Sequence, residues 1–72
     1  MFCPICGSDT FCELEGRPDR EDTVYWNISY QVCIECCSTF EVRYDIVDNE
    51  FAGMTNITGD VDYLEQHVWR KT

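Results

Sequence analysis

The residues with the clearest chemistry in this 72-residue chain are its six cysteines. Four of them form two pairs with the spacing Cys-x-x-Cys. Two residues between thiols allow a tight turn to aim both sulfurs at one point, and a second such turn completes a tetrahedral set of four thiolates. After the first pair comes Gly7, which can adopt the left-handed conformation that points backbone N–H groups at a thiolate. The doubled spacing predicts one structural Zn²⁺ ion bound by Cys3, Cys6, Cys33 and Cys36.

In the second turn, either of two adjacent cysteines could supply the second ligand. Cys37 stands where glycine usually follows this ligand, so it competes with Cys36, although the spacing favours Cys36. Cys12 lies outside both turns in a short apolar segment, and we expect it to be a small core residue. An even number of cysteines in a short chain also fits a disulfide scaffold. That alternative needs an oxidising compartment, and because nothing in the N-terminal residues directs export we favour a metal site.

Catalytic chemistry is not apparent in the sequence. Four thiolates leave zinc no open coordination position, so we expect no metal-bound water to be activated. The single histidine, His67, falls in a segment with helical periodicity, where a solvent-exposed or capping role is most common. The chain contains no G-x-G-x-x-G, Walker A or H-E-x-x-H motif. We therefore expect that the protein is not an enzyme.

Three predicted strands, of which the two longer ones alternate apolar and polar residues, must position the two cysteine turns. Strands are predicted over Thr10–Leu14, Thr23–Val32 and residues 40–46. The apolar members of the two longer strands are Val24, Trp26, Ile28, Tyr30 and Val32, and then Phe40, Val42, Tyr44 and Ile46. This pattern predicts a three-stranded antiparallel sheet with one apolar face, joined at one end by the metal. The predicted fold class is a small zinc-dependent β protein, a zinc ribbon.

The rest of the chain is predicted to be a loop followed by a helix. Residues 48–59 are rich in Asp, Asn, Gly and Thr, which favour turns. From Asp60, which can cap a helix, the period becomes helical, with an apolar stripe of Val61, Leu64 and Val68. Because a helix of this length is only marginally stable in isolation, we expect the stripe to pack on the apolar face of the sheet. The prediction is a single domain over 1–72, with a zinc ribbon over 1–47, a loop over 48–59 and a C-terminal helix over 60–71.

Acidic side chains dominate the charge of this chain. Fourteen Asp and Glu against five Lys and Arg give a formal net charge of −9, and four thiolates (−4) with one Zn²⁺ (+2) would add −2. Such a charge steers a protein towards basic surfaces and away from phosphate. Part of it is concentrated between the first two strands, and we expect that region to bind a partner. Its acidic residues are Glu13, Glu15, Asp19, Glu21 and Asp22.

Direct nucleic-acid binding, the commonest use of zinc ribbons, is the alternative. Affinity for DNA comes largely from phosphate neutralisation by Lys and Arg, and Arg17 and Arg20 are embedded among acids. Tyr25 or Trp69 could stack on single-stranded bases, although aromatic side chains at such spacings more often pack. The charge therefore disfavours DNA and favours a protein partner.

The cysteine turns and the strand that follows them resemble the zinc-ribbon superfamily. The residues that carry the resemblance are the run from Met1 to Cys6, with its Cys-Pro-Ile-Cys, and the run from Cys33 to Glu41. In overall size and in its Met-Phe start, the chain looks most like the Ogr/Delta family of phage late-gene activators, but it carries Glu and Asp where those ribbons carry basic residues. The resemblance covers roughly residues 1–47 and implies a small zinc protein that works on host RNA polymerase.

Rubredoxin, an electron carrier whose iron is held by four cysteines, is a third alternative. It is also small, acidic and aromatic, but its second turn carries Pro and Gly, which this chain lacks there.

Of these alternatives, we expect a non-enzymatic regulator or inhibitor that docks on a basic surface of a protein such as RNA polymerase or another nucleic-acid enzyme. No apolar stretch is long enough to cross a bilayer and no signal-peptide pattern follows Met1, so a cytoplasmic location is expected, in the host cytoplasm if a phage encodes the protein.

Overall fold

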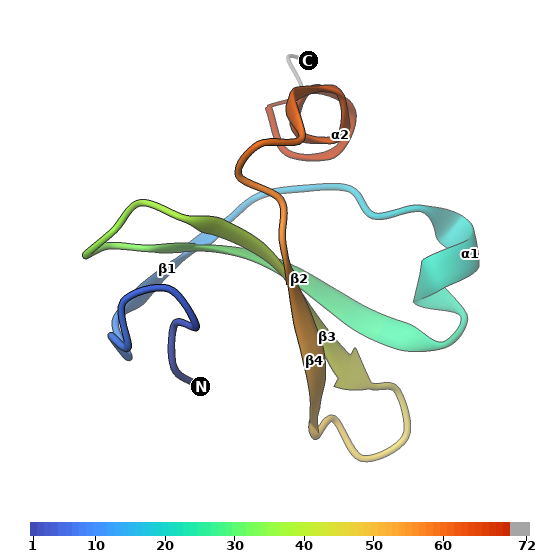
Figure 1. The fold of residues 1–72 in the computed structure, drawn as a ribbon. Coiled ribbons are helices and arrows are strands. Elements are labelled where there is room, and N and C mark those ends of the chain that lie inside the picture. The colour runs from blue at the N-terminus through green and yellow to red at the C-terminus, as the bar shows by residue number, and fades with distance from the viewer. Residues whose placement is uncertain (70–72) are drawn as a thin grey trace.

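A computed structural model describes residues 1–69 of the chain. Its elements are β1 (Phe11–Leu14), α1 (Arg20–Thr23), β2 (Trp26–Cys33), β3 (Thr39–Asp45), β4 (Phe51–Asn56) and α2 (Val61–His67). Within these residues the strands form one antiparallel sheet in the order β1-β2-β3-β4. α2 and the N-terminal segment lie on opposite sides of this twisted sheet (Figure 1). Neither described helix is long and apolar enough to cross a membrane.

The sheet has four strands rather than the three predicted, because β4 lies inside the segment expected to be a loop. Of residues 48–59, only the first few form the turn that their composition predicts. Asn49 adopts φ 58° and donates its backbone N–H to the carbonyl of Asp45 at 2.8 Å. This turn reverses the chain, and β4 then pairs with β3, with Val42 opposite Met54. β4 contains Ala, Gly and Asn, which are poor strand formers, so its sequence did not predict a strand. Pairing with β3 stabilises it.

The apolar stripes of β2 and β3 lie on opposite faces of the sheet, so the prediction of a single apolar face is wrong. In an antiparallel pair, residues opposite each other point to the same face. Tyr30 of β2 is opposite Glu41 of β3, whereas Phe40 is opposite Gln31. The reason is the length of the connection. Because residues 33–38 are even in number, an even-numbered residue of one strand always pairs with an odd-numbered residue of the other.

One group of buried residues, the metal-side cluster, joins the cysteine turns to the apolar stripe of β3. Its members, each at most 3% exposed, are Cys3, Cys33, Phe40 and Val42. Phe11 packs against this cluster, and its ring meets that of Phe40 edge to face with centroids 6.2 Å apart. Packing on this face is therefore continuous with the cysteine turns.

A second group, the helix-side cluster, lies on the other face under α2. Its buried members are Tyr30, Ile57 and Leu64. Asp60 caps the helix as predicted, because its carboxylate accepts the backbone N–H of Tyr63 at 3.2 Å. Leu64 is 1% exposed and Val68 packs beside it, which confirms that part of the predicted stripe, whereas Val61 is 50% exposed. The helix therefore covers the sheet with a narrower apolar face than its sequence predicts.

Two predicted boundaries shift by more than one residue. α2 ends at His67, and residues 70–71 of the predicted helix lie outside the described residues. β2 begins at Trp26 rather than at Thr23, because one turn of helix, α1, precedes it. In this turn the backbone N–H of Thr23 donates to the carbonyl of Asp19 at 3.2 Å. The segment between β1 and β2 is thus an arch, residues 15–25, that leaves one strand and returns through α1 to the next (Figure 1).

Candidate metal centre

Four thiols converge where the two cysteine turns meet. The Sγ atoms of Cys3, Cys6, Cys33 and Cys36 all lie within 4.8 Å of one another. The Sγ atoms of Cys3 and Cys36 are 3.6 Å apart, and those of the other two are 3.5 Å apart. Tetrahedral ligation with metal–sulfur bonds of about 2.3 Å places sulfurs about 3.8 Å apart. The four thiols that the sequence singles out therefore have a spacing that suits one tetrahedral metal ion.

The two turns that carry these thiols have the same backbone hydrogen bonds, although they lie far apart in the sequence. In the first turn the N–H of Gly7 donates to the carbonyl of Cys3 at 2.8 Å, and in the second the N–H of Cys37 donates to the carbonyl of Cys33 at 2.8 Å. The N–H of each first cysteine also donates to a serine carbonyl, at 2.7 and 2.8 Å. The turns are thus two copies of one structure that fixes its thiols through the backbone.

Cys37 takes the place of Gly7 in the second turn. Gly7 has φ 78° and Cys37 has φ 62°, so both residues adopt the left-handed conformation. Glycine adopts it freely, whereas a residue with a Cβ is strained there by about 1 kcal/mol. The thiol of Cys37 is exposed and lies outside the four-thiol group. Of the two adjacent cysteines, the structure therefore brings Cys36 into the group and gives Cys37 a backbone role.

The electrostatics of the four thiols favour a cation between them. Side-chain and backbone hydrogen bonds from Ser38 lower the pKa of the Cys36 thiol to about 6. A backbone hydrogen bond from Ser8 lowers the pKa of Cys6, but desolvation and the other three thiols outweigh it and raise the pKa to about 12. Four thiolates at these distances would repel one another. A divalent cation removes that repulsion and allows all four to ionise.

The centre lies at the surface on one side and in the core on the other. Cys3 and Cys33 are buried, whereas Cys6 is exposed and Cys36 is half-buried. The two buried thiols belong to the metal-side cluster, next to Phe40. An ion with four thiolate ligands has no open position for water or substrate. The arrangement therefore supports a structural ion that cross-links the N-terminal turn to the sheet.

Cys12 is exposed on β1, which corrects the expectation that it is a core residue. Its neighbours on the edge strand divide between the two faces. Phe11 packs with the metal-side cluster and Leu14 packs with the helix-side cluster. Cys12 lies opposite Val32 and belongs to neither cluster.

The five acidic residues predicted to bind a partner lie on β1 and the arch. Asp22 is half-buried and the other four are exposed, namely Glu13, Glu15, Asp19 and Glu21. Ser29 Oγ donates to the carboxylate of Glu13 at 3.0 Å, and the carboxylate of Asp19 lies 3.8 Å from Nε2 of His67. These side chains are therefore at the surface, and partner binding by them stays a prediction.

His67 holds the arch against the C-terminal end of α2. Its Nδ1 donates to the carbonyl of Arg17 at 2.7 Å, and the backbone N–H of Arg17 donates to the carbonyl of His67 at 2.8 Å. The imidazole also packs on Tyr63, with ring centroids 4.3 Å apart. Since this side chain is only 11% exposed, its role is to connect two segments rather than to face solvent.

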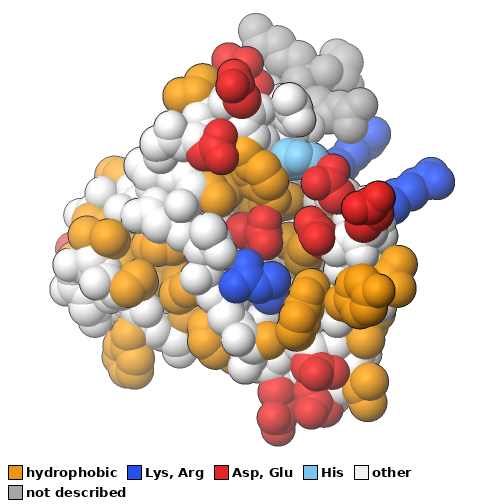
Figure 2. Space-filling model, turned by 45° about the vertical axis from the view of Figure 1, so that its right-hand side comes forward, with side chains coloured by type: hydrophobic (Ala, Val, Ile, Leu, Met, Phe, Trp, Pro, Cys, Tyr) orange, Lys and Arg blue, Asp and Glu red, His pale blue; other side chains and the backbone are white. Residues whose placement is uncertain are grey.

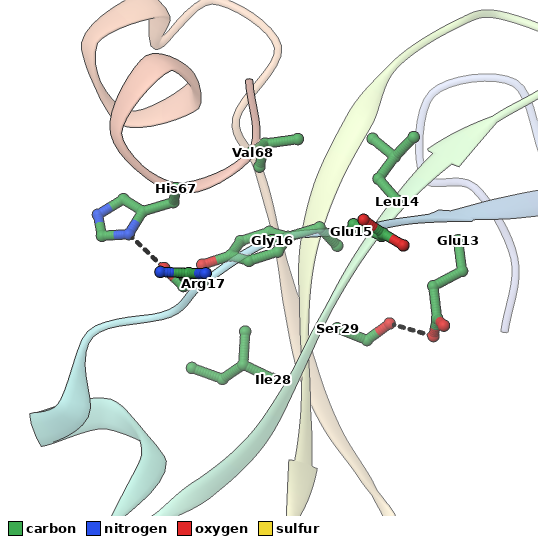
Figure 3. Close-up of a pocket in the computed structure, with 10 residues that line it drawn as sticks. Glu13, Leu14, Glu15, Gly16, Arg17, Ile28, Ser29, His67 and Val68 are labelled. Atoms are coloured by element: carbon green, nitrogen blue, oxygen red, sulfur yellow. Dashed lines mark hydrogen bonds between the residues drawn. The ribbon is translucent and has the colours of Figure 1, made fainter. Parts of the chain in front are cut away.

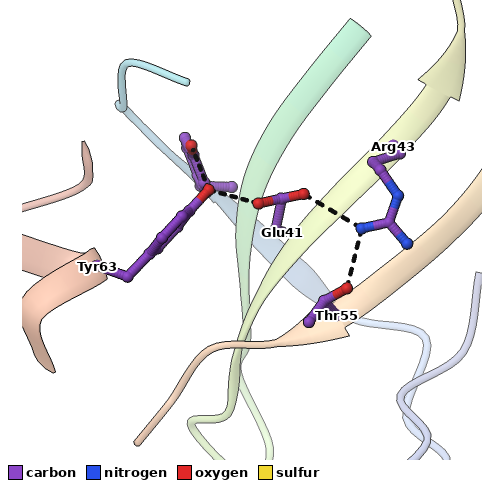
Figure 4. Close-up of polar contacts among 5 residues, drawn as sticks. Glu41, Arg43, Thr55 and Tyr63 are labelled. Atoms are coloured by element: carbon purple, nitrogen blue, oxygen red, sulfur yellow. Dashed lines mark hydrogen bonds and ion pairs between the residues drawn. The ribbon is translucent and has the colours of Figure 1, made fainter. Parts of the chain in front are cut away.

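A polar network between α2 and the sheet was not predicted (Figure 4). The hydroxyl of Tyr63 donates to Glu41, and the hydroxyl of Tyr30 in turn donates to that of Tyr63 at 3.0 Å. Arg43 donates to Glu41 at 3.2 Å and to the hydroxyl of Thr55 at 2.9 Å. Burial, then the hydrogen bond to Glu41, raises the pKa of Tyr63. The sequence feature that could have predicted this network is the even number of residues in the connection 33–38. This length places Glu41 and Arg43 on the face of the sheet that α2 covers.

No protein-family model matches this chain, and no curated protein or solved structure does either. The resemblance to zinc ribbons therefore rests on the cysteine spacing and on the geometry of the two turns, while a relation to phage regulators stays a prediction. The structure shows a small β-rich fold with an antiparallel sheet, a C-terminal helix and four thiols placed to bind a metal ion.

Proposed function

We propose that this protein is a non-enzymatic zinc ribbon that docks on a basic surface of a protein partner. RNA polymerase or another nucleic-acid enzyme fits this description, and the protein would act there as a small regulator or inhibitor of the phage type, in the cytoplasm. The observation that carries the proposal is the formal net charge of −9, to which a zinc ion with four thiolates adds −2. A charge of this size attracts basic surfaces and repels phosphate.

The ion in this proposal is one structural Zn²⁺. Four thiolates in tetrahedral geometry are a preferred ligand set for zinc, and they leave no position for catalysis. Iron in the same ligands would instead make an electron carrier. Metal analysis of the purified protein separates the two: one zinc per chain in a colourless solution supports the proposal, whereas a coloured, iron-loaded protein overturns it.

The distribution of cationic side chains supports a protein partner over nucleic acid. Of the five cationic residues, those at 70–71 lie outside the described residues, and Arg43 is paired with Glu41 between the helix and the sheet. Arg17 and Arg20 are exposed, but the acids of the arch are interspersed with them. On the face shown in Figure 2, acidic side chains gather around the histidine and again at the lower end of the molecule. Such a surface offers few contacts to phosphate.

Direct nucleic-acid binding is the second candidate, and two exposed aromatic side chains favour it. Tyr25 is 68% exposed and Trp69 is 56% exposed. Stacking of a base on such a ring contributes about 1–3 kcal/mol. Fluorescence titration with a single-stranded oligonucleotide at low salt tests this candidate. Binding that weakens with salt and with Tyr25→Ala would favour it over a protein partner, and no binding would remove it.

Binding to purified bacterial RNA polymerase tests the first candidate. With the zinc-loaded protein immobilised, we expect saturable binding that weakens as salt increases, because the attraction is electrostatic. Affinity capture from a bacterial lysate extends the test to other nucleic-acid enzymes. Absence of saturable binding to the polymerase, together with capture of no basic nucleic-acid enzyme, would overturn the proposal.

A further inference from the structure

The edge of β2 that faces β1 is only half paired. β1 pairs with Tyr30–Cys33 of β2, and its last residue, Leu14, lies opposite Tyr30. Residues 26–29 of β2 pair with β3 but, in the part of the chain that the structure describes, they have no strand on the β1 side. Every second residue of a strand directs its N–H and C=O towards a given side. This open edge therefore presents backbone groups that a further strand can bind.

A cavity of about 660 Å³ borders the open edge. Its walls are the end of β1, the start of the arch, β2 and the last turn of α2 (Figure 3). Apolar groups come from Leu14, Ile28 and Val68, and carboxylates come from Glu13 and Glu15. The cavity thus offers room, an apolar wall and negative charge beside unpaired backbone groups.

Near the open edge, the backbone of the arch is hydrogen-bonded to α2 rather than to β2. A Cβ at Gly16 would lie 2.2 Å from the ring of Tyr30, so only glycine allows the arch to cross this ring so closely. The next residue, Arg17, exchanges its backbone N–H and C=O with His67 rather than with β2. Because the backbone N–H and C=O of Arg17 are bonded to His67, they are not free to pair with the open edge of β2.

The charges around the cavity select its occupant. Glu13 and Glu15 line it, and burial followed by the carboxylates of Glu41, Asp19 and Asp22 raises the pKa of Tyr30 in its wall. The lining contains one cationic residue, Arg17, within the described chain. Because negative charge is in excess, a basic segment is favoured over an acidic or neutral one.

We propose that the open edge of β2 binds an extended segment of a basic protein, which adds to the sheet as a short strand and places its Lys or Arg side chains against Glu13 and Glu15. This inference rests on the proposed function and specifies where and how the partner is recognised. In this mode of recognition, main-chain hydrogen bonds provide affinity and the alternate side chains provide selectivity.

A synthetic peptide of five Lys-Val repeats, carrying fluorescein, is a suitable probe for the zinc-loaded full chain. We expect saturable binding by fluorescence anisotropy, and slowed amide hydrogen exchange within residues 26–29 of β2. The same peptide with every backbone amide methylated keeps its charge but has no backbone donor, and we expect it not to bind measurably. Equal binding of the methylated peptide would overturn strand addition.

Charge-reversal variants locate the site. Glu13→Lys/Glu15→Lys should weaken binding of the Lys-Val peptide by about tenfold or more, because two attractive contacts become repulsive. Glu50→Lys/Glu65→Lys is the matched control. It changes the net charge equally at two exposed residues whose carboxylates make no hydrogen bond within the described chain, and it should weaken binding less than about threefold. Equal losses in the two variants would overturn the assignment to this edge.

The outcomes distinguish this inference from the proposed function. If RNA polymerase binds the protein and binding is equally sensitive to both charge-reversal variants, the protein docks through its overall charge and the open edge is not the site. If neither the polymerase nor the Lys-Val peptide binds, the proposed function fails and this inference fails with it. If a single-stranded oligonucleotide competes with the peptide and protects the same amides, the edge binds nucleic acid instead.

Discussion

The two faces of the sheet are stabilised in different ways. On one face the metal-side cluster contains two of the four thiols, so distant parts of the chain are joined there through the cysteine turns. On the other face the helix-side cluster combines apolar packing under α2 with the hydrogen bonds around Glu41. A chain of this length has little core to bury. Each face therefore supplements a small cluster, one with four thiols placed to bind a metal ion and the other with a polar network.

Removal of the metal should have the largest effect and should reach both faces. Structural zinc contributes roughly 10–16 kcal/mol to the folding of small domains, which matches or exceeds the entire stability of most of them, about 5–15 kcal/mol. EDTA, or the substitution Cys36→Ser, should therefore unfold the chain, as measured by far-ultraviolet circular dichroism. Cys37→Ser is the control, because its thiol is adjacent but exposed and outside the group. A native spectrum without metal would mean that the helix-side cluster holds the sheet alone.

Loss of packing under the helix should have the next largest effect and should spare the metal. Leu64 is 1% exposed, and its replacement by Ala should cost about 2–5 kcal/mol in urea unfolding at fixed zinc concentration. Zinc content should remain at one ion per chain, since the thiols lie with the other cluster. Val61→Ala, at a 50% exposed position of the same helix, should change stability by less than about 0.5 kcal/mol. Zinc loss in Leu64→Ala would show that the faces are not independent.

The fold could be predicted from the sequence where one local signal was sufficient. The alternation of Trp26, Ile28 and Tyr30 identified β2, and Asp60 marked the start of α2. β4 was missed because its residues have weak strand propensity and its pairing with β3 is what makes it a strand. The assignment of faces failed for a similar reason. Alternation gives the stripe of each strand, whereas the length of the connection decides whether two stripes share a face.

The convergence of the four thiols could be predicted because it depends on spacing within two short turns. The spacing also favoured Cys36 over Cys37, and in the structure Cys36 belongs to the group, whereas Cys37 adopts φ 62° and its thiol lies outside the group. The role of His67 could not be predicted, because its partner, Arg17, is distant in the sequence and contacts it only after the sheet and α2 are in place. Long-range contacts of this kind leave no periodic pattern in the sequence.

Removal of one hydroxyl tests the polar network of the helix side. Tyr63→Phe should cost about 1–2 kcal/mol, because Glu41 loses a donor in a half-buried site. The pKa of Tyr63 is raised by burial and then by the hydrogen bond to Glu41, so the folded state holds this proton more tightly than the unfolded state does. Its stabilisation is complete below the ordinary value of 10.0 and declines as pH rises above it. Urea midpoints between pH 8 and 11 should therefore fall less steeply in Tyr63→Phe, and an unchanged slope would contradict this assignment.

The smallest expected effect is a gain in stability confined to the metal side. Cys37→Gly removes the strain of a Cβ at φ 62° and should add about 1 kcal/mol in urea unfolding, with zinc bound at least as tightly as before. Gly7→Ala is the reciprocal change. A Cβ there would meet no atom within 4 Å, so strain at φ 78° is its only expected cost, of similar size and opposite sign. Both results would establish that the two turns are equivalent in energy as well as in geometry. Weaker zinc binding by Cys37→Gly would instead mean that the exposed thiol takes part in ligation and that the second turn exchanges two neighbouring cysteines at one position.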